Sequence, residues 1–314
     1  MLSRRFIRVK VFKLLFSCVH SQNFDQVMAE KELLTSLERT RQLYLLIFSL
    51  PVALARYAME RIEIGRQKHR PTEEELDPNM RFVKNKVIAL LENDRELEQA
   101  RRQGLNWTLQ KSYIRKLYDQ LKEEPFFADY MNDPLDPDFK RDMKLIQEFF
   151  STQLEEDQDL YNLLEDQSLY WADDLAYVCN VILAQLAGIK SETETLRHPP
   201  LFYNDDDKVF ATGLLSHSLR NYEEYVGYID KFAQNWDLER IAATDSILIV
   251  MGVSEAVAFH QIPVKVTLNE MVEISKYYST ENSKLFVNGI LDRVIKYLRE
   301  EGRIEKRGKG LIEK

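Results

Sequence analysis

The segment from Ile262 to Leu298 carries two consecutive helix patterns, and it constrains the fold more than any other part of the chain. Thr267 and Glu270 stand in the Thr-x-x-Glu spacing of a capping box, which predicts a helix from near Thr267 to about Tyr278. A second helix is expected from near Ser283, and its apolar residues recur at a spacing of about four: Phe286, Ile290, Val294 and Leu298. Gly289 lies inside this second helix, where glycine is unfavourable, so we expect it to have a packing reason.

Composition favours an all-α protein. The chain has 314 residues, enough for about two domains of roughly 150 residues each. Ten glycines and nine prolines are few, which favours helices over a turn-rich β fold. Cys18 and Cys179 lack the paired spacing of a disulfide scaffold or a metal ribbon, so both are expected to be small buried residues. Asp205-Asp206-Asp207 is predicted to form a turn and helix cap, and neither a metal nor a cofactor is expected.

The first helix is predicted to cover Arg4 to His20, because Ile7, Val11, Leu14, Leu15 and Cys18 fall on one apolar face. Its charged residues are all positive, namely Arg4, Arg5, Arg8, Lys10 and Lys13, although the chain has a net charge of −8. From charge alone, such a cluster is either a solvated helix end or a contact for a polyanion.

Export and membrane insertion are not predicted. Charged residues interrupt the apolar part of the N-terminus, and its continuous run from Leu14 to Val19 is shorter than the roughly 7–15 residues of a signal-peptide core. The longest uncharged stretch, Gln42 to Ala55, contains Pro51 and is shorter than the ~20 residues that span a bilayer. We therefore expect a buried helix there and a cytoplasmic protein.

Between the two ends, the sequence predicts several long helices separated by proline-containing joints. The expected helices are Glu30–Gln67, Asn79–Gln103, Asn106–Leu121, Asp138–Glu155 and Asp157–Leu186. The joints are at Pro71, Asp77-Pro78, Pro125 and Asp133–Pro137. A linker is expected at 191–207, where Pro199-Pro200 precedes the three aspartates.

The two C-terminal helix patterns carry a family resemblance. Pro263-x-Lys265-Val266-x-x-Asn269-Glu270 and Ser283-x-x-Phe286-Val287-Asn288-Gly289-Ile290-Leu291-Asp292 resemble the C-terminal signature of the NusB antitermination family, in a match that runs from about Trp236 to Arg299. Arg4-Arg5-Phe6-Ile7-Arg8 resembles the arginine-rich opening of the family's first helix. The resemblance implies a NusB-like helical bundle with an expanded helical region. We expect the first core helix at 1–20, an inserted region at 21–190, a linker at 191–207, the C-terminal core at 208–302 and a basic, disordered tail at 303–314.

The same resemblance implies an RNA-binding surface on the first and last helices. The residues that match it are Arg4, Arg5, Arg8, Asn282, Ser283, Lys284 and Phe286. A helix N-terminus near Ser283 would suit a phosphate, and the ring of Phe286 could stack on an unpaired base. Two alternatives remain open from the residues themselves, because Phe286 also begins an apolar stripe and the arginines could be a solvated helix end. Leu285 departs from the lysine that is common at this position in the family.

Two acidic residues, Asp245 and Glu255, are expected either to bind a basic partner or to be solvated surface charges. In the resemblance, the partner is the small-subunit ribosomal protein NusE. The implied function is an RNA-binding transcription antitermination factor, which binds boxA-like RNA in nascent transcripts such as ribosomal RNA leaders and joins the transcription elongation complex.

Enzymatic activity is not predicted, because the sequence has no phosphate-binding glycine loop, dinucleotide fingerprint or nucleophile elbow. Two other functions stay open. The chain could be a helical protein-interaction scaffold whose middle helices bind the main partner. It could also be a NusB-like domain associated with RNA modification, a function that needs a glycine-rich strand-turn-helix for the cofactor.

Overall fold

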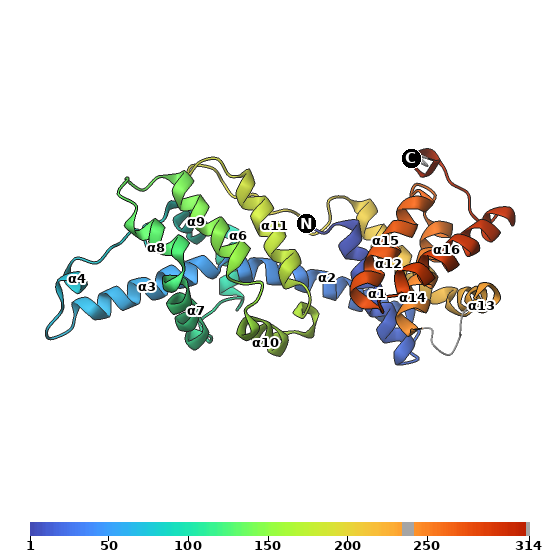
Figure 1. Ribbon diagram of the computed structural model, residues 1–314, viewed down its shortest axis with the longest axis horizontal. Coiled ribbons are helices and arrows are strands. Elements are labelled where there is room, and N and C mark those ends of the chain that lie inside the picture. Colours follow the sequence, from blue (N-terminus) through green and yellow to red (C-terminus); the bar gives the residue numbers. More distant parts are fainter. Residues whose placement is uncertain (234–241, 312–314) are drawn as a thin grey trace. The chain divides into compact units, whose positions relative to one another are not determined.

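The structure is a computed structural model that describes residues 1–233 and 242–311 (Figure 1). Every regular element in these residues is a helix, which confirms the all-α class. The chain divides into two compact units, Met1–Leu37 with Leu201–Lys314, and Glu38–Pro200. We call them unit 1 and unit 2. The sequence places the start of the inserted region at residue 21, whereas unit 1 continues to Leu37, inside helix α2 (Gln26–Phe48).

Unit 1 is a helical bundle around α14, whose residues from Ile247 to Ala256 are all buried (Figure 1). The other helices of this unit are α1 (Arg4–His20), the first part of α2, α12 (Asp205–Arg220), α13 (Tyr222–Phe232), α15 (Val264–Tyr278) and α16 (Ser283–Glu300), with a 3-10 turn η3 at Gly308–Leu311. Helices α1, α12, α13, α15 and α16 all pack against α14 (Ala243–Ala258). The predicted first helix, Arg4 to His20, is confirmed.

The close packing around α14 depends on Gly252 and not on Gly289. A Cβ atom at Gly252 would lie 2.6 Å from Leu291 Cδ2 and 3.0 Å from Met271 Cγ, so only glycine fits without a shift of the neighbours. A Cβ at Gly289 would meet nothing within 4 Å. The expectation that Gly289 is required for packing is therefore wrong, and the close approach between helices is instead at Gly252 of α14.

The predicted capping box at Thr267 and Glu270 is also wrong. Helix α15 begins three residues earlier, after Pro263, whose carbonyl accepts the backbone N–H of Thr267 at 3.2 Å. Pro263 has the fixed φ that suits a residue at the entry of a helix, so the helix starts there. The side chains of Thr267 and Glu270 are consequently free to bond to other helices.

The start of α12 follows the prediction for the aspartate run. Asn204 caps the helix and accepts the backbone N–H of Asp207 at 3.0 Å. Asp205, Asp206 and Asp207 form the first turn, where negative charge is favourable beside the positive end of the helix dipole.

The basic tail is ordered as far as the structure describes it. Arg303 pairs with Glu224, Ile304 is buried, and the amide of Arg307 donates to the carbonyl of His260 at 3.0 Å. Lys306 donates to the carbonyl of Phe259 at 3.0 Å. The expectation of a disordered tail is thus wrong for residues 303–311, because buried and bonded side chains hold the segment on unit 1. Residues 312–314 lie outside the described residues.

Unit 2 contains shorter helices than the sequence predicts. They are the second part of α2, α3 (Leu50–Arg66), α4 (Glu73–Leu76), α5 (Lys86–Glu92), α6 (Arg95–Arg102), α7 (Lys111–Glu123), α8 (Pro125–Asn132), α9 (Phe139–Thr152), α10 (Gln158–Gln167), η1 (Leu169–Trp171) and α11 (Leu175–Gly188). The expected helix Glu30–Gln67 is divided at Ser49, because Pro51 cannot donate the hydrogen bond of a helix interior and instead stands in the first turn of α3.

Buried polar side chains join the helices of unit 2. Asn85 caps α5 by accepting the amides of Val87 and Ile88. Asp142 of α9 accepts the amide of Lys86 at 2.8 Å and the hydroxyl of Tyr130 at 2.7 Å. These bonds satisfy groups that would be costly to bury unpaired, and they fix α5, α8 and α9 together.

One helical stretch, Gln26–Arg66, is long and apolar enough to cross a membrane by length and composition. Of its apolar window, 61% is buried inside the structure, as in a core helix. The predicted burial of Gln42–Ala55 is confirmed by Leu43, Tyr44, Ile47 and Leu54, which are all at most 1% exposed, but the stretch is divided between α2 and α3 and is not one helix.

We expect Gly252→Val to lower the free energy of unfolding by roughly 1–3 kcal/mol, because the added side chain overpacks a filled core. Gly289→Val is the matched control, since it makes the same change in a helix of the same unit with open space around it. Urea unfolding of the two variants measures the difference. Equal losses would show that Gly252 is not a packing constraint.

The tail should respond to pH through Lys306. Burial lowers the pKa of Lys306 from 10.5 to about 8, although the charge of Glu255 opposes this shift. Between these two values the unfolded chain binds the proton and the folded chain does not, so stability from this group rises with pH in that window. Unfolding experiments should show wild type gaining stability relative to Lys306→Met from pH 8 to pH 10.5. A constant difference between them would contradict the buried amine.

Candidate nucleic-acid interface

Arg4 and Arg5 lie at the exposed start of α1, and each bonds to a carboxylate of a neighbouring helix. The side chain of Arg5 is 57% exposed and donates two hydrogen bonds to Glu270 of α15, at 2.9 and 2.8 Å. Arg4, 41% exposed, donates to Asp207 of α12 at 2.9 Å. Both arginines keep part of their surface in solvent, so they remain available to a phosphate.

The pKa of Glu270 follows from this arrangement. Burial raises the pKa of Glu270, but the hydrogen bond from Arg5 and the charges of Arg8 and Arg5 outweigh burial, so its pKa lies below the usual value. The pKa of Arg5 is raised, chiefly by the hydrogen bond to Glu270. This pair therefore stays ionised at neutral pH.

Arg8 is not on the surface. Its side chain is 3% exposed and donates two hydrogen bonds, at 2.6 and 2.9 Å, to Glu255 of α14, which is fully buried. The hydroxyl of Thr267 donates to the same carboxylate at 2.8 Å, and the guanidinium lies 5.0 Å from the ring centre of Phe210. The assignments of Arg8 to RNA contact and of Glu255 to partner binding are therefore corrected. These residues neutralise each other inside the bundle, where an unpaired charge would be costly.

Asp245, the other acidic residue predicted to bind a partner, is also internal. It is 4% exposed and accepts hydrogen bonds from Ser283 at 2.8 Å and Ser279 at 2.5 Å. Ser283 is 1% exposed, and its hydroxyl also accepts the backbone N–H of Thr280 at 3.1 Å. Asp245 thus fastens the turn between α15 and α16 to α14. Its assignment as a surface residue, and that of Ser283 as an RNA contact, are corrected.

Phe286 lies in the core at 4% exposure, in the same stripe as Val287, Ile290 and Val294. Its side chain cannot stack on a base unless it leaves this core. Core packing was the alternative that the residue spacing left open, and the structure adopts it.

Other residues near the start of α16 remain exposed. Asn282 and Lys284 are exposed, as predicted for RNA-facing residues, and Leu285 is 65% exposed. Two tyrosines that were not predicted as site residues lie nearby: Tyr277 is 81% exposed, and the ring of Tyr278 contacts Phe12 at a centroid distance of 5.5 Å. The signal available in the sequence was this pair of adjacent tyrosines at the end of the helix expected to stop near Tyr278.

Contacts from α1 connect these tyrosines to the basic helix. The ammonium of Lys13 lies 5.4 Å from the ring centre of Tyr278. Lys13 follows Arg5 by eight residues on α1, and Tyr278 follows Glu270, the partner of Arg5, by eight residues on α15. The constant offset shows that side chains of α1 reach α15 in the same order along both helices, with Lys13 at the end of α15 that leads into α16. We define the α1–α16 surface as Lys13, Tyr277, Tyr278, Asn282 and Lys284.

Removing the fully buried acid should cost more than removing the half-buried one. Glu255→Gln takes away the carboxylate that holds the buried guanidinium of Arg8 by two hydrogen bonds and leaves only Glu270, 3.7 Å away, as a counter-charge, a loss of about 3–5 kcal/mol. Glu270→Gln is the matched control and should cost roughly 0–1 kcal/mol, because Arg8 keeps both bonds to Glu255 and Arg5 can turn to solvent. Urea unfolding measures both values, and similar losses at the two sites would contradict the internal role of Glu255.

Comparisons with known proteins find a family that matches the C-terminal part of unit 1. The NusB family model matches residues 189–296, from before α12 through most of α16. Transcription antitermination protein NusB of Salinibacter ruber is 41% identical over 113 residues, which are 36% of this chain and 71% of that protein.

Two further proteins with the same name are similar over shorter parts of their length. That of Chloroherpeton thalassium is 36% identical over 106 residues, or 34% of this chain and 50% of the relative. That of Thermodesulfovibrio yellowstonii is 39% identical over 93 residues, or 30% of this chain and 62% of the relative. No solved structure matches. The part of the resemblance from Trp236 to Ile241 lies outside the described residues. The first of these relatives is matched over most of its own length at 41% identity, and the chain therefore belongs to the NusB family.

Proposed function

We propose that this chain is a transcription antitermination factor that binds single-stranded RNA on unit 1. The observation that carries the proposal is the 41% identity to a relative named for antitermination, over 71% of that relative's length. The mechanism would be binding, with no chemical step. A cytoplasmic location goes with this role and is part of the proposal.

RNA contact is proposed at the α1–α16 surface, together with Arg4 and Arg5. The ring of Tyr277 is exposed and offers a stacking platform, which the buried Phe286 does not. Lys13, whose ammonium lies against the neighbouring Tyr278, adds positive charge, as do Lys284 at the start of α16 and the two exposed arginines, in a chain whose net charge is −8. This combination of cations and an aromatic ring suits single-stranded RNA, where phosphates and unpaired bases are both accessible.

The finer proposal is that the RNA is boxA-like, as in ribosomal RNA leaders, and that NusE and the transcription elongation complex are partners. Family membership and the acidic net charge support a basic ribosomal partner, because opposite charges accelerate association. Neither Asp245 nor Glu255 is proposed for this contact, since both carboxylates are buried in bonds to unit 1.

We expect Tyr277→Ala to weaken binding of a boxA-type oligonucleotide by about 1–3 kcal/mol, through loss of one stacked base. Tyr203→Ala is the matched control, because Tyr203 is a 64% exposed tyrosine elsewhere in unit 1. Fluorescence anisotropy at several salt concentrations, with and without NusE, measures affinity.

The salt dependence tests the charges in the same titrations. Lys13→Gln and Lys284→Gln should each reduce the slope of log affinity against log salt by roughly 0.7, the value for one lost phosphate contact on a single strand. If Tyr277→Ala binds as wild type and neither lysine changes the slope, RNA does not bind at this surface.

A further inference from the structure

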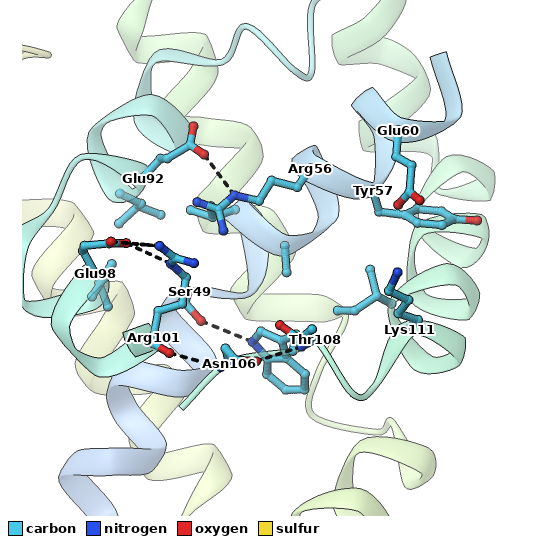
Figure 2. Close-up of a pocket in the computed structure, with 16 residues that line it drawn as sticks. Ser49, Arg56, Tyr57, Glu60, Glu92, Glu98, Arg101, Asn106, Thr108 and Lys111 are labelled. Atoms are coloured by element: carbon cyan, nitrogen blue, oxygen red, sulfur yellow. Dashed lines mark hydrogen bonds and ion pairs between the residues drawn. The ribbon is translucent and has the colours of Figure 1, made fainter. Parts of the chain in front are cut away.

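A cavity of about 220 Å³ opens in unit 2, among α3, α5, α6 and the segment that leads into α7 (Figure 2). Its apolar lining consists of Val52, Leu91, Leu97, Trp107 and Ile114. The indole N–H of Trp107 donates to the carbonyl of Leu46 at 3.1 Å and to the hydroxyl of Ser49 at 3.2 Å. Because the polar edge of this ring is already bonded, the ring serves as an apolar wall of a preformed cavity.

The cavity continues along α3 into a second hollow of about 380 Å³. The two share Tyr57, Glu60 and Lys111. From Ala53 to Gly65, the lining residues of α3 recur every three or four positions, so one face of the helix forms the floor over roughly 18 Å. We call the two hollows together the α3 groove.

Cations outnumber carboxylates in the lining of the α3 groove, in contrast to the acidic chain as a whole. The cations are Arg56, Arg61, Lys68, Arg101, Lys111 and Arg115. The carboxylates are Glu60, Glu75, Glu92 and Glu98. The groove therefore offers a net positive surface around an apolar cavity.

Most of these cations already have partners, whereas Lys111 has no ion-pair partner within residues 1–233 and 242–311. Figure 2 shows Arg56 bonded to Glu92, at 3.0 Å, and Arg101 bonded to Glu98, at 2.8 Å. Among the described residues, no ion pair includes Lys111, which is exposed at the point where the two hollows meet. An incoming carboxylate would find an available ammonium there, beside an apolar cavity.

We propose that the α3 groove binds an acidic segment of a partner protein, which places one large apolar side chain in the cavity and a carboxylate on Lys111. A groove of roughly 18 Å accommodates five or six residues of extended chain at about 3.3 Å each. Ile64, 57% exposed, offers a further apolar contact at the other end. A nucleic acid fits less well, because it carries a phosphate at every nucleotide, beside Glu60, Glu92 and Glu98, whereas the peptide needs a carboxylate only at Lys111 and an apolar side chain in the cavity. The groove lies outside the residues that match the NusB family, so the inference does not depend on the RNA proposal.

The test uses the full-length chain and a panel of labelled nine-residue peptides. Each probe peptide has Asp, Glu and Ser around one central Phe, Leu or Trp. One control series has a central Ser, and another has Lys in place of the acids. Fluorescence anisotropy should show saturable binding of at least one probe with a dissociation constant below about 1 mM, weakened more than about tenfold in both control series.

Two variants then locate the site. Ala53→Trp fills the cavity from its own lining, and Lys111→Glu reverses the available charge without changing the core. Both should weaken peptide binding more than about tenfold. Lys31→Glu is the matched control at an exposed lysine of unit 1 and should bind as wild type. Circular dichroism verifies the helical content of each variant.

Three results would overturn the proposal. The first is no saturable binding by any acidic peptide of the panel. The second is binding that neither Ala53→Trp nor Lys111→Glu weakens. The third is binding of poly(U) that Lys111→Glu weakens while no peptide binds, which would make the groove a nucleic-acid site. Because RNA binding at the α1–α16 surface responds to Tyr277→Ala and not to these variants, the two proposals fail separately.

Discussion

Unit 1 depends on two carboxylates buried on its central helix. Asp245 near the start of α14 holds the turn that begins α16, and Glu255 near its end holds Arg8 of α1. Ten residues separate them, which is about 15 Å along the helix. Each acid would be very unfavourable in an apolar core by itself, so α1 and the α15–α16 turn must be in place to satisfy it. The elements proposed to contact RNA are thereby positioned relative to each other by internal bonds.

This arrangement gives the acidic and basic residues of the family signature an architectural role. Arg8, Glu255 and Thr267 form one buried group, and Asp245, Ser279 and Ser283 form another. A residue in such a group can be indispensable for RNA binding without touching RNA. Loss of the bond between Asp245 and Ser283, for example, would release the helix end that carries Asn282 and Lys284.

Unit 2 is joined by different interactions, and apart from its last residues, 189–200, it lies outside the family match. Its helices are short and are joined by capped turns and buried polar bonds, such as those of Asn85 and Asp142. The long exposed face of α3 is left with a cavity and a cationic rim. With the proposed RNA surface on unit 1 and the proposed peptide groove on unit 2, the chain would connect a transcript to a second component.

The sequence by itself determined the all-α class, the helix Arg4–His20, the start of α16 at Ser283 and the family, because these follow from local apolar spacing, helix-breaking residues and short motifs. It could not determine which polar residues are buried. Arg8 and Glu255 are 247 positions apart and both look like surface charges in one dimension. Only packing around α14 brings them together, and desolvation then makes their pairing obligatory. The apolar spacing left burial of Phe286 open, and packing placed its ring in the core while Tyr277, one helix earlier, stayed in solvent. Local spacing can indicate which apolar residues are buried, but a charged side chain is buried only where the assembled helices supply its partner.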